Sequence, residues 1–223
     1  TLRDTNVTKT ITASSEFTLA LFLNVIRNFP NAINNTKNNL WRVNEDEMRG
    51  REVSTLSTGI IGLGRIGGNM AKYLSALGAK VNYYDPFVTD ERYLKHSNLN
   101  QMLPKCDVIF TCVHVAEDTI NMVNNDFINN MKNNSYFINT SRGEIVVEED
   151  LVHALKSGKI KAAGVDVIRN ENSSNIEKNL LIQYAKNHDN LIVTPHIAGL
   201  SNDSESKAQI AAFEMIYNFL KNE

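Results

Sequence analysis

Short apolar segments alternate with helical patterns through most of this chain, and this alternation limits the possible folds more than any other feature. Six predominantly apolar segments have the length of a strand, and they cover 57–62, 80–84, 107–113, 135–139, 162–167 and 190–194. Helical patterns intervene at 66–77, 124–131 and 148–157, and Gly78 and Gly158 end the first and the last of them. Strands that alternate with helices pair in parallel and are covered on both faces. We therefore expect an α/β fold with a doubly wound parallel sheet.

Composition and charge exclude several kinds of protein. With 223 residues, 42% of them hydrophobic, the chain has the composition of a soluble globular protein. A formal net charge of −2 argues against nucleic acid and against an anionic membrane surface, since both favour a basic face. No apolar run approaches the roughly 20 residues of a spanning helix. Cys106 and Cys112 form no CxxC pair, so we expect buried thiols in a reducing compartment, and no His, Cys and Asp cluster has metal-ligand spacing.

Helical patterns also flank the predicted sheet. Residues 1–10 are polar and without pattern, as in a linker. Residues 11–29 are apolar on more than one face, so this helix should be buried on two sides; Pro30 should end it, and a second helix should occupy about 31–41. Such helices pack between domains or between subunits, and the sequence leaves both possibilities open. Residues 204–220 have the spacing of an amphipathic terminal helix.

Three glycines lie between the first predicted strand and the helix that follows it. Gly62, Gly64 and Gly67 form the pattern GxGxxG, which is weak evidence alone but strong evidence between a strand and a helix. Gly62 permits the tight turn, Gly64 lets the backbone approach a pyrophosphate, and Gly67 lets helix and strand pack closely. The start of the helix then offers unpaired amides and a positive dipole end to the anion. The sequence thus predicts a Rossmann-type domain that binds a dinucleotide.

An acidic residue, Asp85, follows the second predicted strand, roughly twenty residues beyond the glycines. At this place a carboxylate accepts hydrogen bonds from the adenosine ribose hydroxyls, and it would repel the 2′-phosphate of NADP. No basic residue follows before Arg92, so NAD is the expected cofactor. Asp85 also precedes Pro86, and an Asp-Pro pair is typical of a turn, which is the alternative role for Asp85.

Three further polar residues follow the last three predicted strands. Arg142 and His196 come shortly after the fourth and sixth strands, and Glu171 lies five residues beyond Asp166 at the end of the fifth. Ligands bind at the carboxyl edge of an open parallel sheet. The guanidinium of an arginine binds a carboxylate through several N–H donors. An imidazole exchanges a proton near neutral pH, and a glutamate beside it favours the protonated, charged form of the ring. Together these side chains suit carbonyl chemistry.

Several segments around these residues resemble the D-isomer-specific 2-hydroxyacid dehydrogenases. The segments that carry the resemblance are 13–20, 59–67, 138–143, 156–160, 164–167 and 194–199. They occur in the family's order, and the resemblance runs from about residue 11 to the C-terminus. It implies an NAD-dependent oxidoreductase that interconverts a 2-hydroxy acid of the D series and a 2-oxo acid by hydride transfer.

Arg142, Glu171 and His196 are the positions that match the family's active site. By resemblance, NADH delivers hydride to C2 of the 2-oxo acid while protonated His196 gives a proton to the carbonyl oxygen. Glu171 holds and charges His196, and Arg142 binds the substrate carboxylate and polarises the carbonyl. Neutral His196 acts as the base when the reaction runs towards oxidation.

The resemblance also implies which residues line the cofactor. Asp166 matches the residue that contacts the nicotinamide carboxamide and so aligns the ring. The full set implied by the family is Gly62, Gly64, Arg65, Ile66, Gly67, Asp85, Pro86, Cys112, Val113, His114, Thr119, Thr140, Ser141, Arg142, Asp166, His196, Ala198 and Gly199. Cys112 stands where the family commonly has histidine and His114 where it has proline, so His114 either lines the cleft or has a surface or packing role. Glu171 is followed by Asn172 rather than by proline, in a polar loop.

Family members carry a substrate domain before the cofactor domain, and roughly a hundred of its residues have no match here. We expect 1–10 to be the linker from this missing domain, 11–200 the NAD-binding domain with its packing helices, and 201–223 a C-terminal helix that completes the substrate domain. The family also implies a homodimer that pairs through the NAD-binding domain, and a cytoplasmic location. These residues alone should bind NAD yet turn over poorly, because no second domain excludes water from the cleft.

Other interpretations compete with the enzyme. NADH-sensing transcriptional corepressors of the same family keep the fold and much of the active site, and they are the main alternative. A Rossmann methyltransferase is disfavoured by the pairing of Arg142 with His196, and a serine or cysteine nucleophile lacks an elbow motif. His96, His153 and His188 lie in polar or helical contexts, and we expect them to be solvated.

Overall fold

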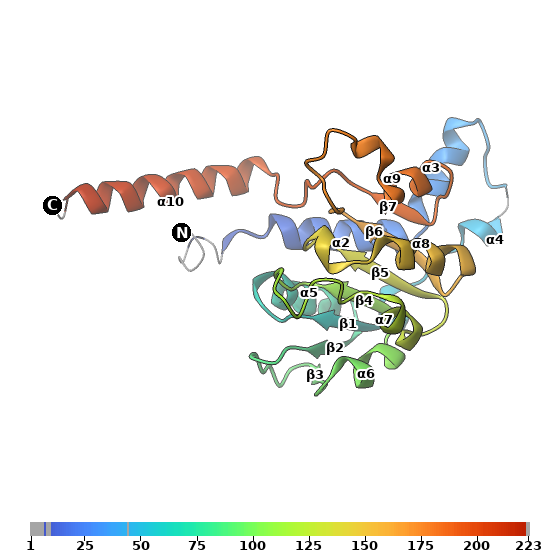
Figure 1. Cartoon of the computed structure of the whole chain (residues 1–223), viewed down its shortest axis with the longest axis horizontal. Coiled ribbons are helices and arrows are strands. Elements are labelled where there is room, and N and C mark those ends of the chain that lie inside the picture. Colours follow the sequence, from blue (N-terminus) through green and yellow to red (C-terminus); the bar gives the residue numbers. More distant parts are fainter. Residues whose placement is uncertain (1–6, 8–9, 44, 222–223) are drawn as a thin grey trace.

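A parallel sheet of seven strands forms the centre of the computed structural model, which describes residues 7, 10–43 and 45–221. The strands lie in the order β3-β2-β1-β4-β5-β6-β7 (Figure 1). Their bounds are β1 Ser57–Ile61, β2 Lys80–Tyr84, β3 Leu94–Lys95, β4 Val108–Thr111, β5 Ser135–Asn139, β6 Ile160–Val165 and β7 Leu191–Val193. All neighbours are parallel, and the order reverses between β1 and β4, the switch point at which such a sheet binds its ligand. The predicted α/β fold with a doubly wound sheet is confirmed.

Helices cover both faces of this sheet (Figure 1). The helices are α2 Ala13–Ile26, α3 Phe29–Lys37, α4 Glu45–Met48, α5 Arg65–Ala76, α6 Leu99–Met102, α7 Asn125–Asn130, α8 Glu148–Ser157, α9 Leu180–Ala185 and α10 Asn202–Lys221. On one face, α2 and α5 pack together, α5 against β1 and β2 and α2 against β5 and β6. On the other, α8 packs against β6 and α9 against β7. None of the described helices is both long enough and apolar enough to cross a membrane.

Side chains alternate between two apolar cores, because successive residues of a strand point to opposite faces. Ile60 of β1 and Phe110 of β4 face α2 and α5, where the ring of Phe22 meets Phe110 edge to face with centroids 5.1 Å apart. Ile61 and Ile109 face the opposite core, which α7, α8 and α9 complete. Burial on both faces explains why β4 and β5, whose residues are all buried, show no alternation of apolar and polar side chains.

The predicted strands and the predicted helices at 66–77, 124–131, 148–157 and 204–220 are all present, with ends that shift by a few residues. The prediction misses β3, α4, α6 and α9. Each of these elements is short, so it contains too few residues to show a clear period. The omission of α9 matters most for function, because α9 packs on β7 beside the candidate site.

Pro30 has a different role from the predicted one. α2 already ends at Ile26, and α3 begins at Phe29, so Pro30 lies in the first turn of α3. Proline is tolerated there because its missing N–H would have no partner within the helix. Asn28, between the two helices, has a φ of 54°, and this left-handed residue turns the chain. The prediction that Pro30 ends the first helix is therefore wrong, although two helices are present.

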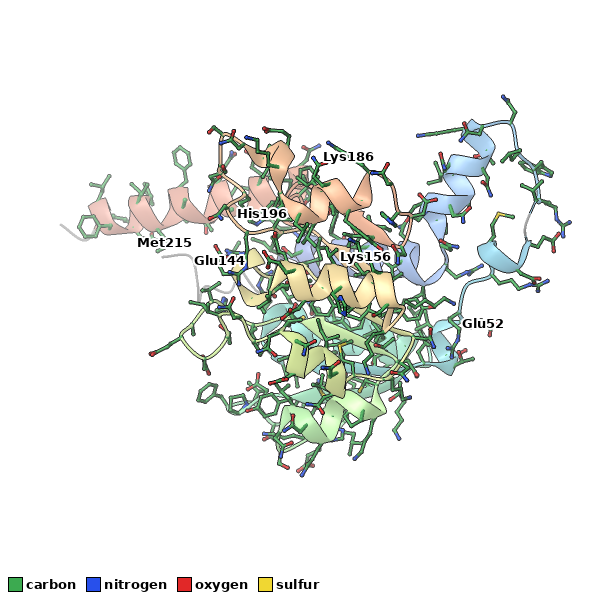
Figure 2. All side chains as sticks on the ribbon, turned by 45° about the vertical axis from the view of Figure 1, so that its right-hand side comes forward. Glu52, Glu144, Lys156, Lys186, His196 and Met215 are labelled. Carbon is green, nitrogen blue, oxygen red and sulfur yellow. The ribbon has the colours of Figure 1, made fainter. Side chains whose placement is uncertain are left out.

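The helices near the two ends of the chain differ in burial. α2 packs against β5, β6, α3 and α5, in agreement with its apolar residues on two faces. α10 instead extends away from the body of the fold, with Met215 on its outer part (Figures 1 and 2). The large hydrophobic side chains that α10 exposes are Ile210, Phe213, Met215, Ile216, Tyr217, Phe219 and Leu220. Residues 1–6 and 8–9 of the predicted linker, and 222–223 of the predicted terminal helix, lie outside the described residues.

The expectation that His96 is solvated is wrong. His96 directly follows β3, is only 6% exposed, and places its Nε2 atom 3.0 Å from Asn82 Oδ1. The Asn82 amide nitrogen donates to Thr58 O, so its oxygen faces the imidazole and accepts from it. His96 thereby ties the short β3 to the buried β2. His153 and His188 are exposed, as expected.

Acid should destabilise the protein through His96. Burial, with smaller contributions from the ammonium groups of Lys105 and Lys80, lowers the pKa of His96 below its ordinary value of 6.5. The folded state thus binds a proton less readily than the unfolded state, so stability is lost as the pH falls through 6.5, by up to about 1.4 kcal/mol per pH unit. In thermal melts below this pH, His96→Gln should depend less on pH than wild type, whereas the exposed control His153→Gln should match wild type. Equal pH slopes for all three proteins would contradict this prediction.

Candidate active site

The predicted site residues lie at the carboxyl edge of the sheet. Gly62 follows β1, and Asp85 follows β2. Across the switch point, Arg142, Asp166 and His196 follow β5, β6 and β7. Parallel strands all end at the same edge, so the topology brings these distant segments together.

The glycine turn has the close backbone contacts that suit a bound pyrophosphate. Gly62 has a φ of +87°, and a Cβ on Gly67 would lie 2.0 Å from the Gly62 carbonyl oxygen. A Cβ on Gly64 would instead meet no described atom within 4 Å. Gly64 is also the N-cap of α5, and no side-chain cap is found at this helix end among the described residues. The amides at the start of α5 are thus available to an anion, which fits the pyrophosphate of NAD.

Asp85 is buried, and its carboxylate organises the neighbouring turn. Its Oδ2 accepts from Leu63 N at 2.7 Å, and its Oδ1 accepts from the amides of Phe87 and Val88, each at 2.8 Å. Burial alone would raise the pKa of Asp85, but these hydrogen bonds and the charge of Lys95 lower it below its ordinary value. A carboxylate has about four lone-pair sites, so one remains for a ribose hydroxyl. The turn role of Asp85 is present, and the ribose contact stays a prediction.

Asp166 organises the turn that carries His196. Its carboxylate is fully buried and accepts from Thr194 Oγ1 at 2.6 Å, from Ile197 N at 3.0 Å and from Ala198 N at 2.8 Å. The amide of His196 donates to Asp166 O, and His196 adopts a φ of 55°. Three acceptor bonds leave one lone-pair site of the carboxylate, so the predicted contact with the nicotinamide stays a prediction.

Glu171 and His196 lie in direct contact although they are 25 residues apart. The Nδ1 atom of His196 lies 2.7 Å from Glu171 Oε1, and the side chains of His196 and Glu171 are 41% and 32% exposed. A carboxylate on Nδ1 fixes the ring and leaves Nε2 for a ligand. In Figure 2, His196 and Glu144 lie towards the end of the fold from which α10 extends, whereas Lys156 and Glu52 lie towards the other end.

Arg142 is exposed, and its guanidinium donates to the carbonyl of Ser141 at 2.7 Å. The buried Asn139 fixes the turn around it, since Nδ2 donates to Arg142 O while Oδ1 accepts from Ser141 N and Thr111 Oγ1. Ser141 Oγ in turn donates to Thr111 O on β4. The sequence prediction misses Asn139 and Thr111 as supports of this turn. Polar residues inside apolar strands are the signal that points to them, because a buried polar group needs a partner.

The segment after β4 packs against the glycine turn. A Cβ on Gly62 would lie 2.7 Å from Cys112 O and 2.8 Å from Val113 Cγ1. Thr119 closes the following loop by donating to His114 O at 2.7 Å, and His114 itself is exposed. Burial raises the pKa of the Cys112 thiol to about 12. This thiol therefore stays protonated at neutral pH, which argues against a cysteine nucleophile.

The remaining predicted cofactor residues lie around the same edge. Arg65 Nη1 donates to Ile11 O at 2.6 Å, and Thr140 Oγ1 lies 2.7 Å from Thr18 Oγ1 of α2. Both contacts join the edge to α2 and the segment before it. Pro86 and Gly199 are exposed, Ile66 is half-buried, and Ala198 is buried. Contact of these residues with NAD stays a prediction.

A pocket of about 700 Å³ opens beside Glu171 and His196. Its polar lining consists of Asp166, Glu171, Asn172, Lys186, Thr194 and His196, and its apolar lining of Ile168, Ile176, Ile182, Ala185, Val193 and Pro195. The pocket thus lies between the end of β7, α9 and the loop that follows β6. A partly apolar pocket next to ionisable side chains is typical of a small-molecule site.

Comparisons with known sequences identify the family of this chain. The family model of the D-isomer specific 2-hydroxyacid dehydrogenase, NAD binding domain, matches residues 19–198. D-3-phosphoglycerate dehydrogenase from Archaeoglobus fulgidus is 33% identical over 213 residues, which are 94% of this chain and 39% of that protein. Glyoxylate reductase from Thermofilum pendens is 31% identical over 220 residues, which are 92% of this chain and 61% of that protein. The chain therefore spans less than two thirds of either relative.

A solved structure supports the same assignment. D-lactate dehydrogenase from Aquifex aeolicus, complexed with NAD and lactic acid, superposes with a TM-score of 0.86 at 30% identity, over 94% of this chain and 66% of that one. The family match and the glycine turn together identify NAD as the cofactor. The chain belongs to the D-isomer specific 2-hydroxyacid dehydrogenases, and it contains their NAD-binding domain.

Proposed function

We propose that this protein, in its full-length form, interconverts a D-2-hydroxy acid and a 2-oxo acid with NAD as the hydride carrier. The observation that carries the proposal is the 2.7 Å hydrogen bond between Glu171 and His196, at the same sheet edge as the glycine turn. Lactate is a 2-hydroxy acid and glyoxylate is a 2-oxo acid, so the names of the similar proteins support this substrate class.

His196, Glu171 and Arg142 have separate roles in the proposed reaction. In reduction, protonated His196 donates a proton from Nε2 to the carbonyl oxygen of the 2-oxo acid, and the hydride that C2 receives comes from NADH when it is bound. Glu171 on Nδ1 stabilises the imidazolium before this transfer. The guanidinium of Arg142 binds the substrate carboxylate with two parallel donors. In oxidation, neutral His196 takes the hydroxyl proton through the same Nε2.

A second domain would complete the cleft over this edge. In this proposal 1–10 lead from that domain, 11–200 form the NAD-binding domain, and 201–223 return to cover the second domain. The exposed apolar side chains of α10 support it, because such a surface is normally covered by another part of the protein. The substrate side chain would then be selected mainly by residues of the second domain.

A homodimer that pairs through the NAD-binding domain is part of the same proposal. α2 is largely buried within the chain, so α3 and the segment after it provide the apolar surface for a second copy. The exposed apolar residues there are Phe29, Ile33, Leu40, Trp41 and Val43. A cytoplasmic location suits the two cysteines, which are both unpaired thiols.

The assay that tests the activity follows NADH absorbance with the full-length gene product and a panel of 2-oxo acids. We expect turnover of at least one 2-oxo acid, and NAD-dependent oxidation of the D isomer rather than the L isomer of the corresponding hydroxy acid. The 223 residues alone should bind NAD but turn over slowly. Intact NADH binding without any turnover by the full-length protein would refute the proposed dehydrogenase activity and favour an NADH-sensing corepressor. Binding of S-adenosylmethionine without binding of NAD would favour a methyltransferase.

A further inference from the structure

The loop that carries Glu171 has little apolar packing of its own. It runs from Arg169 to Asn179, between β6 and α9, and Ile176 is its only apolar residue. Most of its residues are exposed. Hydrogen bonds rather than burial must therefore fix its path, and the position of Glu171 depends on them.

A single buried carboxylate holds both ends of this loop. Glu148, the first residue of α8, is 6% exposed. Its Oε1 accepts from Arg169 N at 2.7 Å, and its Oε2 accepts from Asn179 Nδ2 at 2.8 Å. Glu148 thus closes the loop into a ring that includes Glu171.

The side chain of Arg169 connects the base of the loop to the turn that follows Arg142. Its guanidinium donates to Val146 O at 2.6 Å and to Glu144 O at 2.8 Å, and it also bonds the side chain of Asn121. Glu144 is two residues beyond Arg142. The segments that carry Arg142 and Glu171 are therefore braced against each other through Arg169.

Asn179 connects the far end of the loop to α9. Its Oδ1 accepts from Leu181 N at 3.0 Å and from Ile182 N at 3.2 Å, which caps α9, while its Nδ2 donates to Glu148. Both ends of the Asn179 amide are thus used, and its orientation is fixed. Because Ile182 also lines the pocket, the contact between Glu148 and Asn179 aligns the loop with the pocket wall.

We infer that Glu148 is a positioning residue: by holding Arg169 and Asn179 it keeps Glu171 within hydrogen-bond distance of His196. The kinetic consequences of this role rest on the proposed function, but the contact between Glu171 and His196 that the role explains is independent of turnover. Burial raises the pKa of Glu148, and the hydrogen bonds from Arg169 and Asn179 act in the opposite direction. Placing a carboxylate in this buried position is costly, and both of its oxygens serve the same loop.

The neighbouring residue Glu149 offers a matched control. It lies in the same first turn of α8 but is exposed. Glu149→Gln removes one negative charge from the same helix end and leaves both loop contacts of Glu148 intact. Any effect that Glu148 variants show beyond this control arises from the loop contacts rather than from the charge of the helix end.

Three variants separate the contacts of Glu148. Glu148→Ala removes both, Glu148→Gln keeps an acceptor for Arg169 N, and Asn179→Asp keeps the cap of α9 but sets a second carboxylate against Glu148. One measurement is the low-field proton NMR resonance of the His196 ring proton that bonds Glu171; the other is the steady-state kinetics of the full-length protein. We expect Glu148→Ala and Asn179→Asp to lose the resonance and to lower kcat about ten- to a hundredfold, with the KM for NADH little changed. Glu148→Gln should be intermediate, and Glu149→Gln should match wild type.

Each outcome decides at least one of the two proposals, the role of Glu148 and the proposed function. If folded Asn179→Asp keeps the resonance and the wild-type kcat, the role of Glu148 is refuted, and this holds even if Glu148→Ala fails to fold. A wild-type protein without the resonance would refute it as well. Variants that lose the resonance in a full-length protein that turns over no 2-oxo acid would support the role of Glu148 and refute the proposed function.

Discussion

His196→Asn is expected to lower kcat of the full-length enzyme about a thousandfold, with a much smaller effect on the dissociation constant of NAD. Asparagine cannot exchange a proton near neutral pH. His196 has a φ of 55°, and asparagine adopts this conformation more readily than most residues, so the turn should be preserved. Steady-state kinetics with a 2-oxo acid and calorimetric titration with NAD measure the two quantities.

Glu171→Gln should lower kcat less than His196→Asn does. The glutamine retains a hydrogen-bonding group near Nδ1 but lacks the negative charge that stabilises the imidazolium. Glu177→Gln, an exposed glutamate on the same loop, is the matched control and should behave as wild type. Wild-type kcat in His196→Asn would refute acid–base catalysis by His196, and equal losses in both glutamate variants would show a general effect of charge on the loop.

Gly64→Ala should weaken NAD binding about a hundredfold, or about 2.8 kcal/mol, without destabilising the fold. A Cβ on Gly64 meets no described atom within 4 Å, so the protein itself has room for it. The backbone of Gly64 has a φ of −69°, which alanine tolerates. The added methyl group would instead occupy space that the pyrophosphate needs. Titration with NAD and thermal melting of the same variant separate the two effects.

Gly67→Ala is the contrasting change in the same turn. Its Cβ would lie 2.0 Å from the Gly62 carbonyl oxygen, which belongs to the backbone and cannot rotate away. The variant should therefore lose about 1–3 kcal/mol of stability as well as NAD affinity. A destabilised Gly64→Ala, or a Gly67→Ala that is as stable as wild type, would contradict this account of the turn.

The local patterns of the sequence are sufficient for the sheet and for the glycine turn. β2 and β5 have the predicted bounds, and each contains three β-branched or aromatic residues, which favour strands. Gly62, Gly64 and Gly67 are recognisable because the turn is built from residues close in the chain. The mistake at Pro30 is also local, since proline is compatible both with the end of one helix and with the first turn of the next.

Long-range contacts explain what the prediction misses. His96 is surrounded by polar neighbours in the chain, and its burial depends on the pairing of β3 with β2. Glu148 has the pattern of an ordinary acidic residue at the start of a helix, and its partners Arg169 and Asn179 lie 21 and 31 residues away. A pattern in sequence records no distance between such residues.

Local patterns in the sequence predict the order of the longer strands and helices, the dinucleotide turn and the polar residues that follow the strands. Parallel strands end at one edge, so this order also predicts that Arg142, Glu171 and His196 lie at the same edge as the dinucleotide turn. The resemblance implies that Glu171 holds His196. The folded structure adds that this contact is made through Nδ1, that Asp166 holds the turn beneath His196, and that α9 closes a pocket beside them. Strand periodicity and glycine turns act over a few residues, whereas these long-range contacts depend on the packing of elements far apart in the chain.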